Sequence, residues 1–481
     1  MMRLCILSLT ALLLAPMADL QAGETANPNV LLVVVDDLNV DLGCYGNPMV
    51  KSPAVDRLAS RGVRFDRAYC QYALCNPSRT SFLSGRRPET TGVYANGRTP
   101  RQALPDAIML PQLFRQKGYF SAGAGKVFHS VRNNDPLSWD FYQDGEGEDD
   151  QEKAALAARY KAGDKTPRAY PLDGDGSKTR DGLNTRKIAG YLAEHAKSGK
   201  PFFLALGLHK PHLPWTAPKR FFDLYPPGSI PEPDSPPMTG IPAIALQTEL
   251  AGGPLPPSRL AAITGYYACI SFTDDNLRQV LDELDRHKLR ETTVVALLGD
   301  NGFHLGDHGG LWAKHTAFEN ATRVPLIIAG AGVPRGKVVT QPVELLDLYP
   351  TLAELCGISA PSGLEGKSLV PVMKSNSELP SAHAYSMIYH YDVATGTDIL
   401  GRSVRTPDYR YTEWADEKHE RELYLASQTP AEHHNQASNP EARTQLAQGE
   451  HLLRELKLPK PGPTTRPDAL FKSKGRKQDE K

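Results

Sequence analysis

The chain of 481 residues carries 55 Lys and Arg against 55 Asp and Glu, so its formal net charge is zero. A balanced charge provides no long-range field for nucleic acid or an anionic membrane surface, which excludes both as expected partners. Any anionic ligand must therefore be bound by a local cluster of cationic residues. The length is typical of one large domain with a smaller companion.

The first 22 residues have the layout of a secretory signal peptide. Arg3 precedes an apolar run over residues 4–15, and small residues follow near Ala18 and Ala22. No later apolar run approaches the ~20 residues needed to cross a bilayer. We therefore expect no membrane span and predict an exported protein, periplasmic or secreted.

Three continuous apolar runs predict the central strands of a sheet that is covered on both faces. They span residues 30–37, 201–212 and 293–301. Helical periodicity predicts helices over residues 52–62, 110–118, 185–198 and 271–288. Alternating strands and helices indicate an α/β fold with a site along the carboxyl edge of the sheet. The Pro- and Gly-rich stretches 145–180 and 225–258 predict long irregular loops.

The sequence pattern changes after residue 330. Residues 343–357 predict one further helix of the large domain, and short alternating aromatic stretches from about residue 382 predict a small antiparallel sheet. We expect a signal peptide at 1–22, a catalytic domain at 23–375, a C-terminal α+β subdomain at 376–458 and a basic, disordered tail at 459–481.

Acidic and amide side chains stand at the ends of two of the predicted strands. Asp36 and Asp37 end the first strand, and Asp300 and Asn301 end the third. Either pair alone could cap a strand end. Together they form an oxygen-only set, which favours a hard cation and suits calcium better than magnesium.

A second set is cationic. It comprises Lys126 and His129 in GAGKVFH, His209 and His212 in GLHKPH, and Lys314 and His315 in GLWAKH. With Arg79, these residues predict a pocket that holds a tetrahedral oxyanion beside a divalent cation, with histidines available for proton transfer. That combination is typical of an ester hydrolase acting on a sulfate or a phosphate.

Composition alone leaves four possible roles for Cys75. It could form a disulfide (most plausibly to Cys70), bind a metal, act as a nucleophile, or simply pack in the core. Beyond residue 22 the chain has an odd number of cysteines at irregular spacing and no CxxC pair. That pattern argues against a disulfide-built fold and against a cysteine zinc site.

The stretch CNPSRTSFLSGRRP, residues 75–88, resembles the signature CxPSRxxxxxGRxP of the type I, formylglycine-dependent sulfatases. The order of DD, CxPSR, GKxxH, HKPH, GDNG and WxKH also follows that family. Flanking stretches such as LLVVVDDLNVDLGCYGN and LGDHGGLWAKH look like the iduronate-2-sulfatase branch, and the match spans roughly residues 28–440.

This resemblance implies an alkaline phosphatase-like large mixed sheet flanked by helices, and it implies roles for the candidate residues. A formylglycine-generating enzyme would oxidise Cys75 to an aldehyde, whose hydrate attacks sulfur, and Arg79 would fix that hydrate. Calcium would be held by Asp36, Asp37, Asp300, Asn301 and the modified Cys75. Lys126 and Lys314 would neutralise the sulfate, His209 would protonate the leaving sugar oxygen, and His129 would assist breakdown of the sulfated intermediate.

The implied substrate is a sulfated carbohydrate, with the 2-O-sulfate of a uronic acid as the favoured target. The branch often has histidine at the position of Asn301; we expect metal binding to survive this difference, and Phe303 beside it is a candidate for a change in the sugar pocket. Two alternatives stay open. One is a phosphodiesterase or phosphonate monoester hydrolase of the same superfamily, and the other is a glycan-binding protein in which Cys75 is never oxidised.

Overall fold

The computed structural model describes residues 27–144, 151–163, 169–231, 234–248, 259–375, 382–392, 397–415, 420–429 and 431–457. The predicted signal peptide and the predicted C-terminal tail lie outside the described residues. Within the described part of the chain, no helix is long and apolar enough to cross a membrane.

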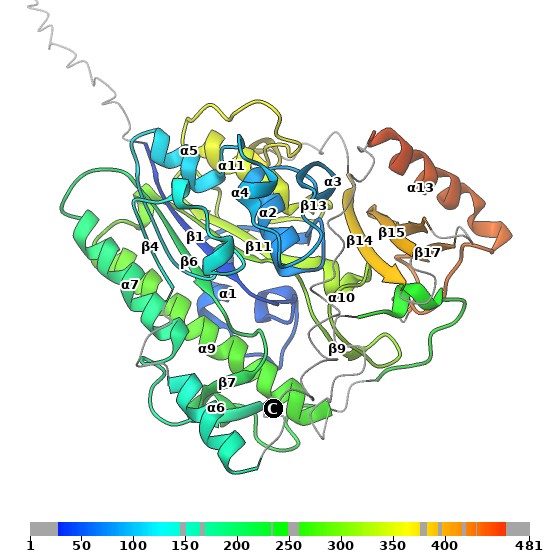
Figure 1. Ribbon diagram of the computed structural model, residues 1–481, viewed down its shortest axis with the longest axis horizontal. Helices are drawn as coiled ribbons and strands as arrows, with labels where there is room; N and C mark the ends of the chain where they lie inside the picture. The colour runs from blue at the N-terminus through cyan, green and yellow to red at the C-terminus, as the bar shows by residue number, and fades with distance from the viewer. Residues whose placement is uncertain are drawn as a thin grey trace, which may run out of the picture.

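A mixed sheet forms the centre of the large domain (Figure 1). Its strands run in the order β12-β2-β11-β8-β1-β6-β3-β4, and β13 also pairs with β2. Their bounds are β1 (Asn29–Val35), β2 (Gly62–Tyr69), β3 (Phe120–Gly125), β4 (Phe141–Gln143), β6 (Phe202–Leu208), β8 (Thr293–Gly299), β11 (Arg323–Gly330), β12 (Lys337–Val339) and β13 (Val343–Glu344). The three predicted strands are confirmed as β1, β6 and β8, with β1 central and parallel to both neighbours.

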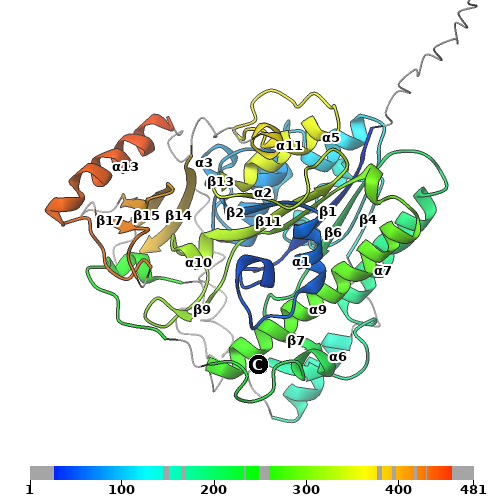
Figure 2. The ribbon, with the colours of Figure 1, turned by 180° about the vertical axis from the view of Figure 1, so that it is seen from behind.

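Helices cover both faces of this sheet (Figures 1 and 2). They are α1 (Pro53–Ser60), α2 (Cys75–Ser84), α3 (Pro88–Thr91), α4 (Pro100–Ala103), α5 (Leu110–Gln116), α6 (Gln151–Lys161), α7 (Arg180–His195), α8 (Lys219–Phe222), α9 (Arg259–Arg286), α10 (Glu319–Thr322), α11 (Leu348–Leu355), α12 (Val370–Lys374) and α13 (Arg443–Glu455). Alternate residues of β1 enter two cores, because successive side chains of a strand point to opposite faces. Val30, Leu32 and Val34 pack with α2, α5 and α11, whereas the residues between them pack with α1, α7 and α9.

A four-stranded antiparallel sheet forms the core of the C-terminal subdomain, as the alternating aromatic stretches predict. Its strands are β14 (Ala384–Asp392), β15 (Thr397–Arg405), β16 (Tyr409–Trp414) and β17 (Arg421–Leu425). Both views place α13 on the outer side of this sheet, away from the large domain (Figures 1 and 2). The backbone amide of Met387 in β14 donates to the carbonyl of Gln71, which joins the two sheets next to α2.

Within the region 145–180, the described residues 151–163 and 169–180 are more ordered than the composition predicts. They contain α6 and the short strand β5 (Ala169–Leu172), which pairs with β7 (Trp215–Pro218). The expectation of an irregular loop was wrong there, because the stretch QEKAALAARYK consists mostly of strong helix formers. Helix α9 also begins twelve residues before the predicted start, with Arg259 in place of Ser271.

Two glycines allow β3 and β6 to approach closely where the site begins. Gly125 and Gly207 are paired in register, and a Cβ on Gly207 would lie 2.1 Å from the carbonyl carbon of Lys126. We expect Gly207→Ala to lower the free energy of unfolding by at least about 1–3 kcal/mol, because the backbone of a central strand cannot move aside. Thermal unfolding measures this effect.

Gly190→Ala is the matched control. Gly190 lies on the exposed side of α7 and a Cβ there would meet nothing within 4 Å, so alanine should stabilise the helix by about 0.5–1 kcal/mol. Equal unfolding temperatures for the two variants would contradict the close approach of β3 and β6.

Candidate active site

The candidate site begins where two adjacent parallel strands end. Asp36 and Asp37 follow β1, and Asp300 and Asn301 follow β8, whose last residue Gly299 pairs with Val35. The amide of Asp37 donates to Oδ1 of Asp300 at 3.0 Å, and Nδ2 of Asn301 donates to Oδ1 of Asp37 at 2.8 Å. One carboxylate oxygen from each of the three aspartates lies within 4.8 Å of the others.

Cys75 is the first residue of α2 and faces this acidic edge. Its Sγ lies 2.9 Å from Nζ of Lys314, 3.9 Å from Nζ of Lys126 and 4.0 Å from Oδ1 of Asp37. All cysteines among the described residues are free thiols, so the alternative of a bridge to Cys70 finds no support. Burial, together with the charge of Asp36, raises the pKa of the Cys75 thiol well above its usual value. The unmodified side chain is therefore a neutral thiol and a poor nucleophile.

Arg79 lies one turn further along α2 and is completely buried. Its Nε donates to Asp300 at 2.8 Å and its Nη2 to Asp36 at 3.1 Å, while Nη1 bonds the carbonyls of Lys126 and Val127. Burial opposes the charge of Arg79, but Asp300 and Asp36 raise its pKa, so it stays cationic. Arg79 thus ties the ends of β1, β8 and β3 together.

The two lysines pair with the two acids that follow β1. Lys126 contacts Asp36 and Lys314 contacts Asp37. Burial raises the pKa of Asp36, but Lys126 and the other nearby cations outweigh this effect and hold it well below its usual range. The opposite balance holds at Asp300, where burial raises the pKa to about 6 against the pull of Arg79. The cluster therefore combines fixed negative charge with two ammonium groups beside Cys75.

These residues fit a hard divalent cation. Three carboxylates converge, and Oδ1 of Asn301 is buried without a hydrogen-bond donor within the described part of the chain. A buried amide oxygen without a donor is costly, and a cation that prefers oxygen ligands would satisfy it.

Strained backbone is concentrated at the same place. Asp37, Ala313 and His315 adopt the left-handed conformation, with φ of 58°, 72° and 76°. Such conformations are costly for residues other than glycine and are found where function requires a fixed geometry. Lys314, between the last two, is thereby held toward Cys75.

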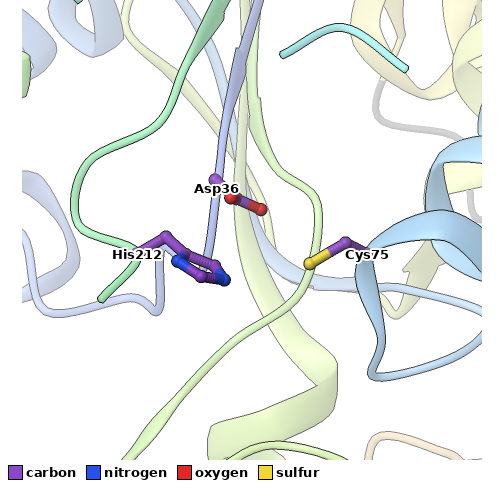
Figure 3. Close-up of side chains that lie close together, drawn as sticks. All are labelled: Asp36, Cys75 and His212. Carbon is purple, nitrogen blue, oxygen red and sulfur yellow. The ribbon is translucent and has the colours of Figure 1, made fainter. Parts of the chain in front are cut away.

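His212 lies at the site, as expected for a member of the predicted cationic set, although the sequence assigned it no individual role. Figure 3 shows its ring, Asp36 and Cys75 converging from the loop after β6, the end of β1 and the start of α2. Its Nε2 lies 3.8 Å from Asp37, and its ring is 39% exposed. The second histidine of HKPH was the available signal, but only the fold brings it toward the acids.

His209 and His129 lie at the margin of the cluster. Nε2 of His209 is 3.6 Å from Oδ1 of Asp144, a residue that the sequence did not single out, and the amides of His209 and Lys210 donate to Asp181. Burial lowers the pKa of His209 to about 3. Burial and the charge of Lys126 lower the pKa of His129 to about 2. Both rings are therefore neutral in the free protein.

Comparison with known proteins agrees with this geometry. The profile of the sulfatase family matches residues 28–358, which is most of the chain. The chain belongs to the sulfatase family. A second profile, N-sulphoglucosamine sulphohydrolase, C-terminal, matches residues 306–458 of this sulfatase.

Individual relatives match along most of their length. A sulfatase of Formosa agariphila is 34% identical over 472 residues, covering 89% of this chain and 87% of the relative. Human iduronate 2-sulfatase is 32% identical over 532 residues, covering 89% and 94%. The crystal structure of a phosphonate monoester hydrolase from Agrobacterium radiobacter superposes with a TM-score of 0.72 at 21% identity, covering 89% and 95%. The last likeness concerns the fold alone and confirms the expected alkaline phosphatase-like architecture.

Phe303 takes no visible part in the site. Its ring is 2% exposed and stacks on Tyr266 with a centroid distance of 5.8 Å, next to Trp215 at 6.0 Å. The expectation that Phe303 alters the sugar pocket is not supported, because an aromatic ring two residues after the strand-end amide is drawn into the hydrophobic core instead.

Proposed function

We propose that this sulfatase hydrolyses the 2-O-sulfate ester of a uronic acid residue in a sulfated carbohydrate. The observation that carries the proposal is the 32% identity with iduronate 2-sulfatase, which extends over 94% of that protein. The lysine pair beside Cys75 supports the sulfate ester as the target, because two ammonium groups suit the negatively charged oxygens of a sulfate.

The proposal includes conversion of Cys75 to formylglycine by a separate generating enzyme. The neutral buried thiol supports this step, because an unactivated thiol is a weak nucleophile. One hydroxyl of a hydrated aldehyde can attack sulfur, and the second lets the covalent sulfate ester leave as the aldehyde re-forms. The modification would take place around export, which rests on the signal peptide predicted at residues 1–22.

Calcium is the proposed cofactor. Asp36, Asp37, Asp300 and Asn301 would hold it, together with an oxygen of the modified residue 75. When bound, it supplies charge stabilisation for the nucleophile and the sulfate.

The protein groups then have separate tasks. Lys126 and Lys314 hold the sulfate oxygens next to position 75. The resemblance implied that Arg79 fixes the hydrate; because its guanidinium bonds Asp300, Asp36 and two backbone carbonyls, we assign it instead to holding the acidic cluster in place.

His209 donates a proton to the leaving sugar oxygen, with Asp144 orienting its ring. His129 transfers a proton during breakdown of the sulfated intermediate. Sulfate bound nearby would help the neutral rings of the free protein to acquire the proton that an acid needs.

Hydrolysis of defined substrates tests the proposal, measured as released sulfate for the sulfate esters and as released alcohol for the phosphorus esters. A disaccharide with a 2-O-sulfated uronate should be turned over faster than one with a 6-O-sulfated hexosamine and than a phosphonate monoester or phosphate diester. Preference for the hexosamine sulfate would leave a sulfatase with a different sugar, and preference for the phosphorus esters would favour the hydrolase alternative.

A leaving-group comparison tests His209. A sugar alkoxide needs a proton as the S–O bond breaks, whereas a nitrophenolate does not. His209→Ala should therefore slow hydrolysis of the sugar sulfate by about 10²–10⁴-fold but that of nitrophenyl sulfate by less than roughly tenfold.

Lys126→Ala is the control, because it removes a sulfate contact that both substrates share and should slow both to a similar degree. Equal losses on both substrates in the His209 variant would assign this residue a binding role and move the acid to His129 or Lys314.

A further inference from the structure

The hairpin of β9 (His304–Asp307) and β10 (Leu311–Ala313) carries a second cluster of metal-binding side chains, separate from the acidic cluster at Cys75. Nδ1 of His304 and Nδ1 of His308 both contact Oδ1 of Asp307, the second at 2.8 Å. One donor atom of each residue lies within 4.8 Å of the other two. His304 is completely buried and His308 is 6% exposed.

The outer nitrogen of each ring faces an acceptor. Nε2 of His304 lies 2.8 Å from Oγ1 of Thr316, and Nε2 of His308 lies 3.4 Å from Oε2 of Glu432. Histidine ligands of metals typically have their distal N–H near an acceptor; His304 has a hydrogen bond to Thr316, whereas His308 has only the nearby carboxylate of Glu432, without hydrogen-bond geometry. Glu432 is itself fixed, because Arg410 donates to its Oε1 at 2.5 Å. Both rings are thus oriented with Nδ1 toward Asp307.

The backbone and the exposure of the cluster are consistent with a binding site. His308 and Glu432 both adopt the left-handed conformation, with φ of 47° and 56°, which is costly at residues other than glycine. Oδ2 of Asp307 accepts from the amide of Leu305 at 2.9 Å, which leaves Oδ1 on the side of the two rings. The Asp307 side chain is 24% exposed, so a cation and a water ligand can reach it from solvent.

We propose that His304, Asp307 and His308 bind a zinc ion. Two imidazoles and one carboxylate, with a water in the fourth position, are ligands that zinc prefers, whereas calcium prefers the oxygen-only set at Asp36. The ion connects the hairpin, which leads directly to Lys314, with the C-terminal segment that carries Glu432. A proton competes with zinc for His308. Burial disfavours the imidazolium, but Asp307 and Glu432 raise the pKa of His308 to about 9.

Equilibrium dialysis against zinc tests this site. The experiment uses the full chain with Cys75→Ala, in excess calcium, so that neither the thiol nor the acidic cluster takes up zinc. Elemental analysis should give one zinc per chain, and zinc should raise the unfolding temperature. Cobalt in its place should give the visible absorption of a four-coordinate site.

Variants assign the ligands. His304→Gln and His308→Gln should lose the zinc, the cobalt spectrum and the thermal shift. His287→Gln, which removes a histidine paired with Glu283 elsewhere on the surface, should retain all three. Failure of the parent protein to bind zinc, or retention of zinc by both ligand variants, would overturn the proposal and leave the cluster as a proton-mediated link. Neither result bears on sulfate hydrolysis, which the parent protein lacks by design.

Discussion

Cys75→Ala should reduce sulfate-ester hydrolysis by at least about four orders of magnitude, the scale on which enzymes lose activity with their nucleophile. The Sγ of Cys75 lies 3.9 Å from Nζ of Lys126 and 2.9 Å from Nζ of Lys314, the two groups that would hold the sulfate. The substitution removes only a sulfur atom from a buried position, so the protein should fold. Sulfate release and a thermal unfolding curve measure the two effects.

Cys70→Ala is the matched control. Cys70 is also buried, its Sγ contacts the carbonyl of Ala321 at 3.8 Å, and it packs in the hydrophobic core with β1 and α2. Its variant should keep activity at a similar cost in stability. Substantial turnover by the Cys75 variant would remove the nucleophile from the proposed mechanism.

Asp300→Asn should lower activity by at least about 100-fold, since even the outer partners of metal ligands typically contribute 10–100-fold. The amide keeps the size of the side chain but loses the charge that pairs with Arg79 and would bind calcium. Calcium affinity, measured by titration calorimetry, should fall in parallel.

Asp274→Asn separates this effect from the general cost of altering a buried acid. The carboxylate of Asp274 accepts hydrogen bonds from the amides of Ala54 and Val55 at the start of α1. Ala54 and Val55 belong to the core on the α1, α7 and α9 side of the sheet, and Asp274 lies far from Cys75 in the sequence. Its variant should retain calcium binding and activity. Wild-type turnover that survives exhaustive chelation, in protein free of metal, would contradict the role of calcium.

The sequence predicts the part of the site that depends on strand ends. Asp36, Asp37, Asp300 and Asn301 converge because β1 and β8 are adjacent, parallel and in register in the structure. The two apolar runs that both end in polar residues predict a site at the carboxyl edge of the sheet. The long signature around Cys75 identified Cys75 and Arg79 as site residues, whereas helix α2, which carries both, was not predicted. Both features lie in contiguous sequence, so they could be read without coordinates.

Contacts between loops could not be read in this way. The proximity of His212 to Asp37 and of Asp144 to His209 depends on where loops fold back over the sheet. The position of Phe303 in the hydrophobic core could not be predicted either, because its aromatic neighbours come from β7 and α9. Helix α6 was not predicted because the region around it is rich in Pro and Gly, although its own eleven residues favour a helix.

Mass analysis of the tryptic peptide between Arg67 and Arg79 shows whether formylglycine at residue 75 is the source of activity. The protein is produced with and without a formylglycine-generating enzyme, and the fraction of residue 75 in the aldehyde form is compared with the specific activity of each preparation. We expect activity proportional to the aldehyde fraction and none in protein with the intact thiol. Full activity from protein in which Cys75 is entirely unmodified would contradict this expectation.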